Sequence, residues 1–178
     1  MRFDLGNGYC IRSFLYGDAA SLARHGNNWE IAKNLRDSFP HPYTVEHARV
    51  WIQHIKEHEA DTRFVIDFEG EAIGEIGFVS QLDVHRHVAE IGYWVSQVHW
   101  GKGIMTKALS RVCQYAMDDQ GVVRIYADVV DHNQGSARIL EKVGFQREAV
   151  FRKHIYKGEE FYDQLVFGLL RPDLNTDC

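Results

Sequence analysis

The sequence predicts one α/β domain over residues 1–178, a twisted mixed sheet of antiparallel and parallel strands with helices on both faces. Three observations support this prediction. The chain has 178 residues, the size of one ordinary domain, which can bury a core without disulfides or metal ions. Segments with strand-like and helix-like spacing of apolar residues follow one another, without internal repeats, low-complexity tracts or an obvious linker. Near the middle of the chain, a hairpin pattern precedes a strand, a glycine-containing loop and a helix.

Composition and charge exclude several classes of protein. A content of 45% hydrophobic and 25% charged residues is globular, so we expect the whole chain to fold. The net charge of -5 argues against a nonspecific nucleic-acid binder and suits cationic partners. Cys10, Cys113 and Cys178 are odd in number and widely spaced, which favours neither a disulfide framework nor a zinc knuckle. Without an apolar signal core or a membrane-length apolar stretch, a cytoplasmic protein that does not bind membranes is expected.

Residues 9–60 are predicted to form one strand and three helical segments. Residues 9–14 form a plausible strand, after which Asp18 is a candidate cap for a helix. A short helical segment begins at residues 27–28 and ends before residues 39–42, where two prolines favour extended backbone. Thr44 opens a third helix that should end near residue 60, because apolar residues recur there at helical spacing. These residues are Ala48, Trp51, Ile52 and Ile55.

A hairpin and a further strand lead to the centre of the chain. Strands over residues 63–68 and 73–79 flank Glu69-Gly70-Glu71, a tight turn signal. The next strand covers residues 88–95, and the loop and helix after it carry the first functional signal.

Two glycines stand at the start of that helix. After Gly103 the apolar residues fall on one helical face, so Gly101 and Gly103 lie at the helix N-terminus. Glycines let backbone N–H groups approach a ligand, and the positive end of a helix favours negative charge. The pattern predicts a cradle for a pyrophosphate, to which Lys102 either adds a contact or remains a solvated loop lysine. By itself a Gly-x-Gly turn is weak evidence, since such turns often only link strands to helices.

The segment from Trp100 to Met105, after the strand AEIGYWV, resembles the acyl-coenzyme A signature of the GNAT N-acetyltransferase superfamily. That signature usually carries Gln or Arg, two variable residues, Gly, one variable residue, then Gly or Ala. These positions fall here on Trp100, Gly103 and Met105, so Gly103 carries the match and Trp100 removes one expected phosphate contact. Gly-x-Gly-Ile-Met is similar to the branch of ribosomal-protein N-terminal (RimJ/RimL-like) acetyltransferases. The resemblance implies coenzyme contacts from Trp100, Gly101, Lys102, Gly103, Ile104 and Met105.

A second motif follows a predicted strand over residues 124–130. Asn133 can cap a short helix, Gly144 can end it in left-handed geometry, and Phe145 can begin the next strand. The run from residue 131 to 145 resembles the second motif of the superfamily, in which the Asn contacts the pantetheine arm of the coenzyme. The resemblance extends over most of the chain, to the opening strand and helix and to a closing hairpin.

Acetyl transfer needs a base for the amine, polarisation of the thioester carbonyl and an acid for the thiolate. The resemblance implies Glu90 as the base, although a surface strand residue is the alternative. It also implies that backbone N–H groups of Tyr93, Trp94 and Val95 polarise the carbonyl. Many relatives use a Tyr acid where this chain has Leu140, so Ser136 is the candidate acid, with a role at the helix start as the alternative. The expected reaction is direct attack of an amine on acetyl-coenzyme A through a tetrahedral intermediate, without a metal ion.

The resemblance leaves the amine open: a protein N-terminus, a polyamine, an amino acid or an antibiotic. Candidate walls for its pocket are Trp29, Tyr43, Tyr156 and Tyr162, all of which also suit a core. The protein is expected to act as a monomer or homodimer.

Three other interpretations compete with an acetyltransferase. His54-Ile55-Lys56-Glu57-His58 spells a zinc-protease pattern, but ten histidines make a chance match easy and no third ligand is marked. The His85-Arg86-His87 segment suggests a metal clip but lies in a predicted turn. A non-catalytic acyl-coenzyme A sensor would explain why Trp100 and Leu140 replace familiar functional residues.

Overall fold

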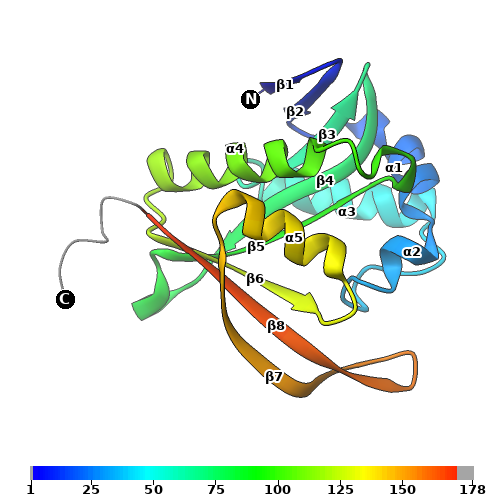
Figure 1. The fold of residues 1–178 in the computed structure, drawn as a ribbon. Helices are drawn as coiled ribbons and strands as arrows, with labels where there is room; N and C mark the ends of the chain where they lie inside the picture. The colour runs from blue at the N-terminus through cyan, green and yellow to red at the C-terminus, as the bar shows by residue number, and fades with distance from the viewer. Residues whose placement is uncertain (1, 172–178) are drawn as a thin grey trace. The chain divides into compact units, whose positions relative to one another are not determined.

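The computed structural model describes residues 2–171, which form an α/β architecture with a mixed sheet flanked by helices (Figure 1). The chain forms two compact units, described separately below. The first comprises Met1–Gly77 with Tyr93–Ala108, and the second Phe78–Gly92 with Leu109–Cys178. That residues 1–178 form one domain stays a prediction, and Cys178 lies outside the described residues.

The first unit joins antiparallel strands in the order β1-β2-β3-β4 to helices α1, α2 and α3. It also holds the end of β5, the short helical turn η3 and the start of α4. Its elements are β1 (Arg2–Gly6), β2 (Tyr9–Arg12), η1 (Tyr16–Asp18), α1 (Ala19–Gly26), α2 (Trp29–Ala32), α3 (Val45–His58), β3 (Arg63–Phe68), β4 (Glu71–Ser80), β5 (Val88–Val95), η3 (Gln97–His99) and α4 (Ile104–Asp118).

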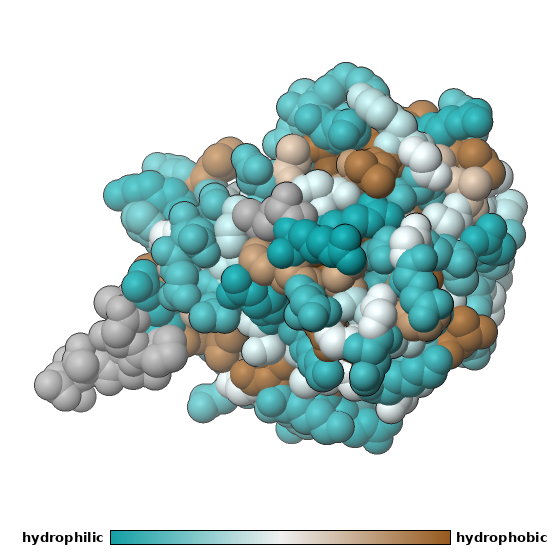
Figure 2. Space-filling view, turned by 90° about the horizontal axis from the view of Figure 1, so that it is seen from above, coloured by the Kyte–Doolittle hydropathy of each residue, from teal (hydrophilic) through white to brown (hydrophobic). Residues whose placement is uncertain are grey.

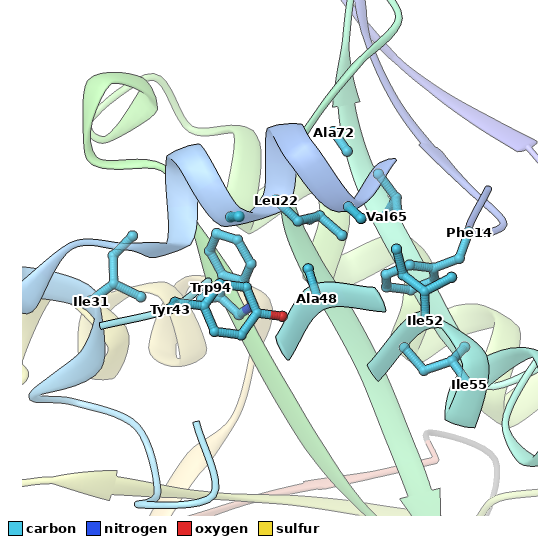
Figure 3. Packing of buried hydrophobic residues seen from close by; sticks show 12 residues of the cluster. Phe14, Leu22, Ile31, Tyr43, Ala48, Ile52, Ile55, Val65, Ala72 and Trp94 are labelled. Atoms are coloured by element: carbon cyan, nitrogen blue, oxygen red, sulfur yellow. The ribbon is translucent and has the colours of Figure 1, made fainter. Parts of the chain in front are cut away.

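Buried side chains from α1 and α3 pack on strands β3, β4 and β5 in the core of this unit (Figure 3). Trp94 of β5 and Tyr43, which precedes α3, lie together in it. Apolar residues at helical spacing on α3 explain the contact, because they place one stripe of the helix against the strands. Ala48, Ile52 and Ile55 are at most 1% exposed, as the sequence predicts.

Capping of the helices in the first unit agrees with the sequence at Thr44 and differs at Asp18. The Thr44 side chain accepts a hydrogen bond from His47 N–H at the start of α3. Asp18 occupies the N-cap position of α1, as predicted, but its carboxylate makes no cap bond to this helix. It instead accepts from Leu15 N–H and from both terminal nitrogens of Arg12, each at 2.8 Å. The charged partner outcompetes the helix start because an ionic hydrogen bond is about twice as strong as a neutral one.

The second unit contains the parallel pair of the sheet. Its strand order is β5-β6-β8-β7, with β5 and β6 parallel and the other two pairs antiparallel. The rings of Phe78 on β4 and Tyr115 on α4 lie 6.3 Å apart, and α5 packs against β7. The remaining elements are η2 (Asp83–His85), β6 (Arg124–Val130), α5 (Gln134–Val143), β7 (Gln146–Lys157) and β8 (Glu160–Leu170).

The face of the molecule seen in Figure 2 is mostly hydrophilic, with small hydrophobic patches. Within residues 2–171, no helix combines the length and the apolar character needed to cross a membrane.

Candidate functional site

The glycine loop predicted to bind the coenzyme lies in the first unit, between η3 and α4. Gly101 and Gly103 have φ angles of +76° and +74°, a left-handed conformation that side chains disfavour. A Cβ atom added at either glycine would meet no protein atom within 4 Å. Both glycines are therefore required by backbone conformation and face open space, as a backbone that approaches a ligand requires.

Helix α4 begins directly after this loop. Lys107 N–H donates to Gly103 O at 3.2 Å, which makes Gly103 the residue that opens the helix. The first N–H groups of an α-helix have no partner within it, so those of Ile104 and Met105 point out of the helix start. Partial positive charge gathers at such an end and favours an anion. Lys102, which is exposed in the loop, adds a full positive charge.

Ile104 and Met105 cannot contact a ligand with their side chains, because these are 4% and 5% exposed and belong to the core. The backbone N–H groups are what these residues offer to a ligand. Trp94 and Val95 at the end of β5 are similarly buried, each 8% exposed. Tyr93, beside them, is partly exposed.

The Trp100 side chain forms a hydrogen bond within the loop segment. Its indole N–H donates to Val95 O at 2.9 Å, so this nitrogen is already engaged. The Gln or Arg usual at this position in the acyl-coenzyme A signature could offer a donor to a phosphate. In this chain the side chain instead closes the loop onto the end of β5. Asn28 adds a second brace, its amide nitrogen donating to Gln97 Oε1 at 2.8 Å.

Glu90, the predicted base, lies in the second unit at the point where the parallel strands separate. Among the described residues, the pairing of β5 with β6 runs from Val88 with Arg124 to Glu90 with Tyr126, although both strands continue. Ala89 and Ile91 on either side of Glu90 are buried, whereas Glu90 is partly exposed. Side chains alternate across a strand, so Glu90 lies on the more open face.

Asn133 and Ser136, also in the second unit, lie in the first turn of α5. Asn133 caps this helix, since its side-chain oxygen accepts from Ser136 N–H at 3.2 Å. A ligand contact by Asn133 would therefore use its amide nitrogen. Gly144 ends the helix with a φ of +106°, as its sequence position predicts. Leu140, which occupies the position of the usual Tyr acid, is completely buried.

The four predicted pocket walls differ in their surroundings. Tyr43 is 5% exposed and belongs to the core, where burial raises the pKa of its hydroxyl, and it therefore forms no open wall. Trp29 and Tyr156 are exposed, and Tyr162, which is partly exposed, donates to Glu160 at 2.7 Å.

The histidine patterns at residues 54–58 and 85–87 do not form metal sites in the part of the chain that the structure describes. Within residues 2–171 no three His, Cys, Asp or Glu residues are grouped so that they could hold a metal ion. His54 Nε2 lies 3.3 Å from Glu59 Oε1, and His87 Nδ1 lies 3.1 Å from Gly121 O. These contacts are those of ordinary surface and turn residues.

Comparison with known proteins identifies the family and agrees with the fold. The family profile described as "Acetyltransferase (GNAT) domain" matches residues 9–146. The uncharacterized N-acetyltransferase YoaA of Bacillus subtilis is 39% identical over 102 residues, 57% of each chain. The probable N-acetyltransferase YjcK of the same bacterium is 38% identical over 136 residues, 74% of this chain and 75% of that protein.

Two further similarities concern enzymes named for ribosomal proteins. The ribosomal protein uS5 alanine N-acetyltransferase of Escherichia coli is 30% identical over 105 residues, 59% of this chain and 54% of that enzyme. The structure of ribosomal-protein-S5-alanine acetyltransferase from Vibrio fischeri shares the fold, with a TM-score of 0.82 at 22% identity, over 99% of this chain and 100% of that one. With the profile covering most of the chain, these findings show that the protein belongs to the GNAT family and is an acetyl-coenzyme A-dependent N-acetyltransferase.

Proposed function

We propose that this N-acetyltransferase acetylates the α-amine at the N-terminus of a protein. The observation that carries coenzyme binding is the left-handed Gly101 and Gly103 loop at the start of α4, with open space where side chains would stand. The similarity to the uS5 alanine enzyme supports a protein N-terminus as the acceptor.

In this proposal, Gly101, Lys102, Gly103, Ile104 and Met105 hold the coenzyme diphosphate. The contacts are backbone N–H groups and the Lys102 ammonium, because the Ile104 and Met105 side chains are buried. Trp100 shapes the loop. In the first unit, the backbone N–H groups of Tyr93, Trp94 and Val95 are assigned to the thioester carbonyl. For the second unit, the amide nitrogen of Asn133 is assigned a contact to the pantetheine arm. Acetyl-coenzyme A supplies the acetyl group as an activated thioester.

Proton transfer is assigned to two residues of the second unit. Glu90 takes the proton of the amine, directly or through a water molecule, and its partial exposure at the separation of β5 and β6 supports this role. Ser136, in the first turn of α5, is the proposed acid for the leaving thiolate. The aliphatic side chain of Leu140 cannot act as an acid, so another residue must protonate the thiolate.

Direct transfer, without an acyl-enzyme, fits the two described cysteines. Burial raises the pKa of the Cys113 thiol to about 12. Burial and the nearby Asp67 carboxylate likewise raise the pKa of Cys10. A thiol attacks as its thiolate, so neither group is suited to carry an acetyl group near neutral pH.

Coenzyme A release, followed with a thiol reagent, tests the proposal. The panel contains peptides beginning with Ala, Ser or Met, together with polyamines, amino acids and aminoglycosides. We expect turnover above the amine-free blank with peptides, and none with the same peptides carrying a blocked N-terminus. Turnover confined to polyamines, amino acids or aminoglycosides would refute the protein acceptor. Coenzyme binding without turnover on any amine would favour a sensor.

A further inference from the structure

Four polar side chains of the first unit, three of them buried, form an array of two hydrogen-bonded pairs next to the loop that precedes α4. The Tyr9 hydroxyl, on β2, lies 2.9 Å from His99 Nδ1, and the Ser96 hydroxyl lies 2.9 Å from His25 Nδ1, on α1. The two imidazole rings approach edge to face, with centroids 6.4 Å apart. Tyr9, Ser96 and His99 are 6%, 4% and 8% exposed. Residues separated by up to 90 positions thus meet at one place.

Glu71 determines which groups of the His25–Ser96 pair donate and which accept. His25 Nε2 lies 2.6 Å from Glu71 Oε1. Hydrogen bonds from Arg24 and from His25 hold the pKa of the Glu71 carboxyl below its usual range, so it is ionised at neutral pH and only accepts. Nε2 of His25 therefore carries a proton. In a neutral imidazole Nδ1 is then the acceptor, and the Ser96 hydroxyl donates to it.

In residues 96–103, the buried side chains are those of Ser96 and His99, and both belong to the array. Gln97, Val98 and the residues from 100 to 103 are exposed. Polar contacts therefore fix much of the path of this loop. They are the hydrogen bonds of the Ser96 and His99 side chains, the bond from Ser96 N–H to Ile73 O at 2.8 Å, and the bond from the Trp100 indole N–H to Val95 O.

We propose that Tyr9 and His25, acting through His99 and Ser96, are positioning residues for the coenzyme-binding loop. The inference rests on the proposed binding of the diphosphate by residues 101–105. Loop backbone that is already in place pays no ordering cost when the ligand arrives, so the array increases affinity for the coenzyme without touching it. Loss of a hydrogen bond leaves a buried polar atom unsatisfied, which favours alternative loop conformations.

The first test needs no ligand. In the coenzyme-free protein, hydrogen exchange of the His99 and Trp100 amides, which donate to Ser96 O and Gln97 O, should be about tenfold faster in Tyr9→Phe and in Ser96→Ala than in the unmodified protein. Tyr115→Phe is the matched control. Tyr115 is 5% exposed, and its hydroxyl accepts from Gln120 at 2.8 Å in the second unit. Its removal should leave exchange in the loop unchanged.

The second test measures the consequence. For Tyr9→Phe and Ser96→Ala, the Kd of acetyl-coenzyme A by calorimetry and its KM should rise about tenfold, with kcat within about twofold of the unmodified enzyme. Tyr115→Phe should change neither constant.

The outcomes separate the array from the proposed function. Unchanged loop exchange in both array variants, or faster exchange throughout the first unit, would overturn the array as a positioning device. Faster loop exchange with unchanged coenzyme affinity would overturn it as well. An unmodified protein that fails to bind acetyl-coenzyme A would instead refute the proposed function, and the exchange experiment would still decide whether the array orders the loop.

Discussion

A substitution of Gly103 separates three contributions to coenzyme binding: backbone conformation, space and charge. Gly103 has a φ of +74° and open space where a Cβ atom would stand. Gly103→Gln introduces a side chain at this φ, and Gly103→Glu introduces one of the same shape with a negative charge. Gly121, after α4, has a φ of +69° and equally open surroundings, so Gly121→Gln reproduces the strain away from the loop.

Each contribution has an expected magnitude. A side chain in left-handed geometry costs about 1–2 kcal/mol. In a chain of this length, that cost lowers the Tm by about 2–8 °C at either glycine. A carboxylate about 4 Å from a phosphate charge adds up to about 4 kcal/mol of repulsion at an effective dielectric constant of 20. This corresponds to a factor of about a thousand in the Kd.

Calorimetric titration with acetyl-coenzyme A and thermal unfolding of the same samples measure these effects. All three variants should lose similar thermal stability. Gly121→Gln should bind the coenzyme normally, Gly103→Gln should bind at least about tenfold more weakly because of crowding, and Gly103→Glu should bind more weakly still. The difference between the two Gly103 variants should shrink as the salt concentration rises from about 0.01 M to about 1 M, because salt screens the repulsion.

Two results would refute this reasoning. If Gly103→Glu binds as tightly as Gly103→Gln at low salt, no negative group of the ligand lies near residue 103. If Gly121→Gln weakens binding as much as Gly103→Gln, the loss reflects general destabilisation.

Three further predictions concern the proposed base and two ion pairs. Glu90→Gln should lower kcat at least about tenfold with an unchanged Kd for acetyl-coenzyme A; normal turnover would exclude Glu90 as the base. Arg63→Ala should lower the free energy of unfolding in urea by about 3–5 kcal/mol, because it leaves the buried Glu75 carboxylate without its cation; a loss under about 1 kcal/mol would show that Glu75 is protonated. The hydrogen bond from Arg124 lowers the pKa of Glu148, so this carboxyl stabilises the fold above its unfolded value of about 4.3 and loses that effect as pH falls through its lower folded value. The stability advantage over Glu148→Gln should therefore be present at neutral pH and vanish in acid, and an advantage that persists in acid would contradict the ion pair.

Most of the strands and helices could be predicted because their apolar residues are continuous or periodic. The strands over residues 88–95 and 124–130 have the predicted ends, since each is rich in β-branched and aromatic residues and lies between turns. The sequence pattern does not predict the first strand, residues 2–6, although Gly6-Asn7-Gly8 is a turn signal at its end. It is a short edge strand in which Leu5 alone is buried, and so it lacks a clear apolar pattern.

The glycine loop at the start of α4 could be predicted from the sequence, whereas the side chains that contact it could not. Gly101 and Gly103 are adjacent to the helix that they open, so a local pattern reveals them. Tyr9 and His25 reach the loop through tertiary structure alone and leave no local signal. Trp100 looked like the loss of a ligand contact, and only the structure shows that its indole N–H braces the loop at Val95.

The measurement that tests the central claim most directly is a titration of the isotope-labelled protein with acetyl-coenzyme A, followed by the backbone amide resonances. If the loop at the start of α4 holds the diphosphate, the amides of Gly101, Lys102, Gly103 and Ile104 should show the largest shifts. A ligand without the diphosphate, such as acetyl-pantetheine, should not shift them to the same extent. Saturation with acetyl-coenzyme A that leaves these four amides unmoved would contradict the proposed site.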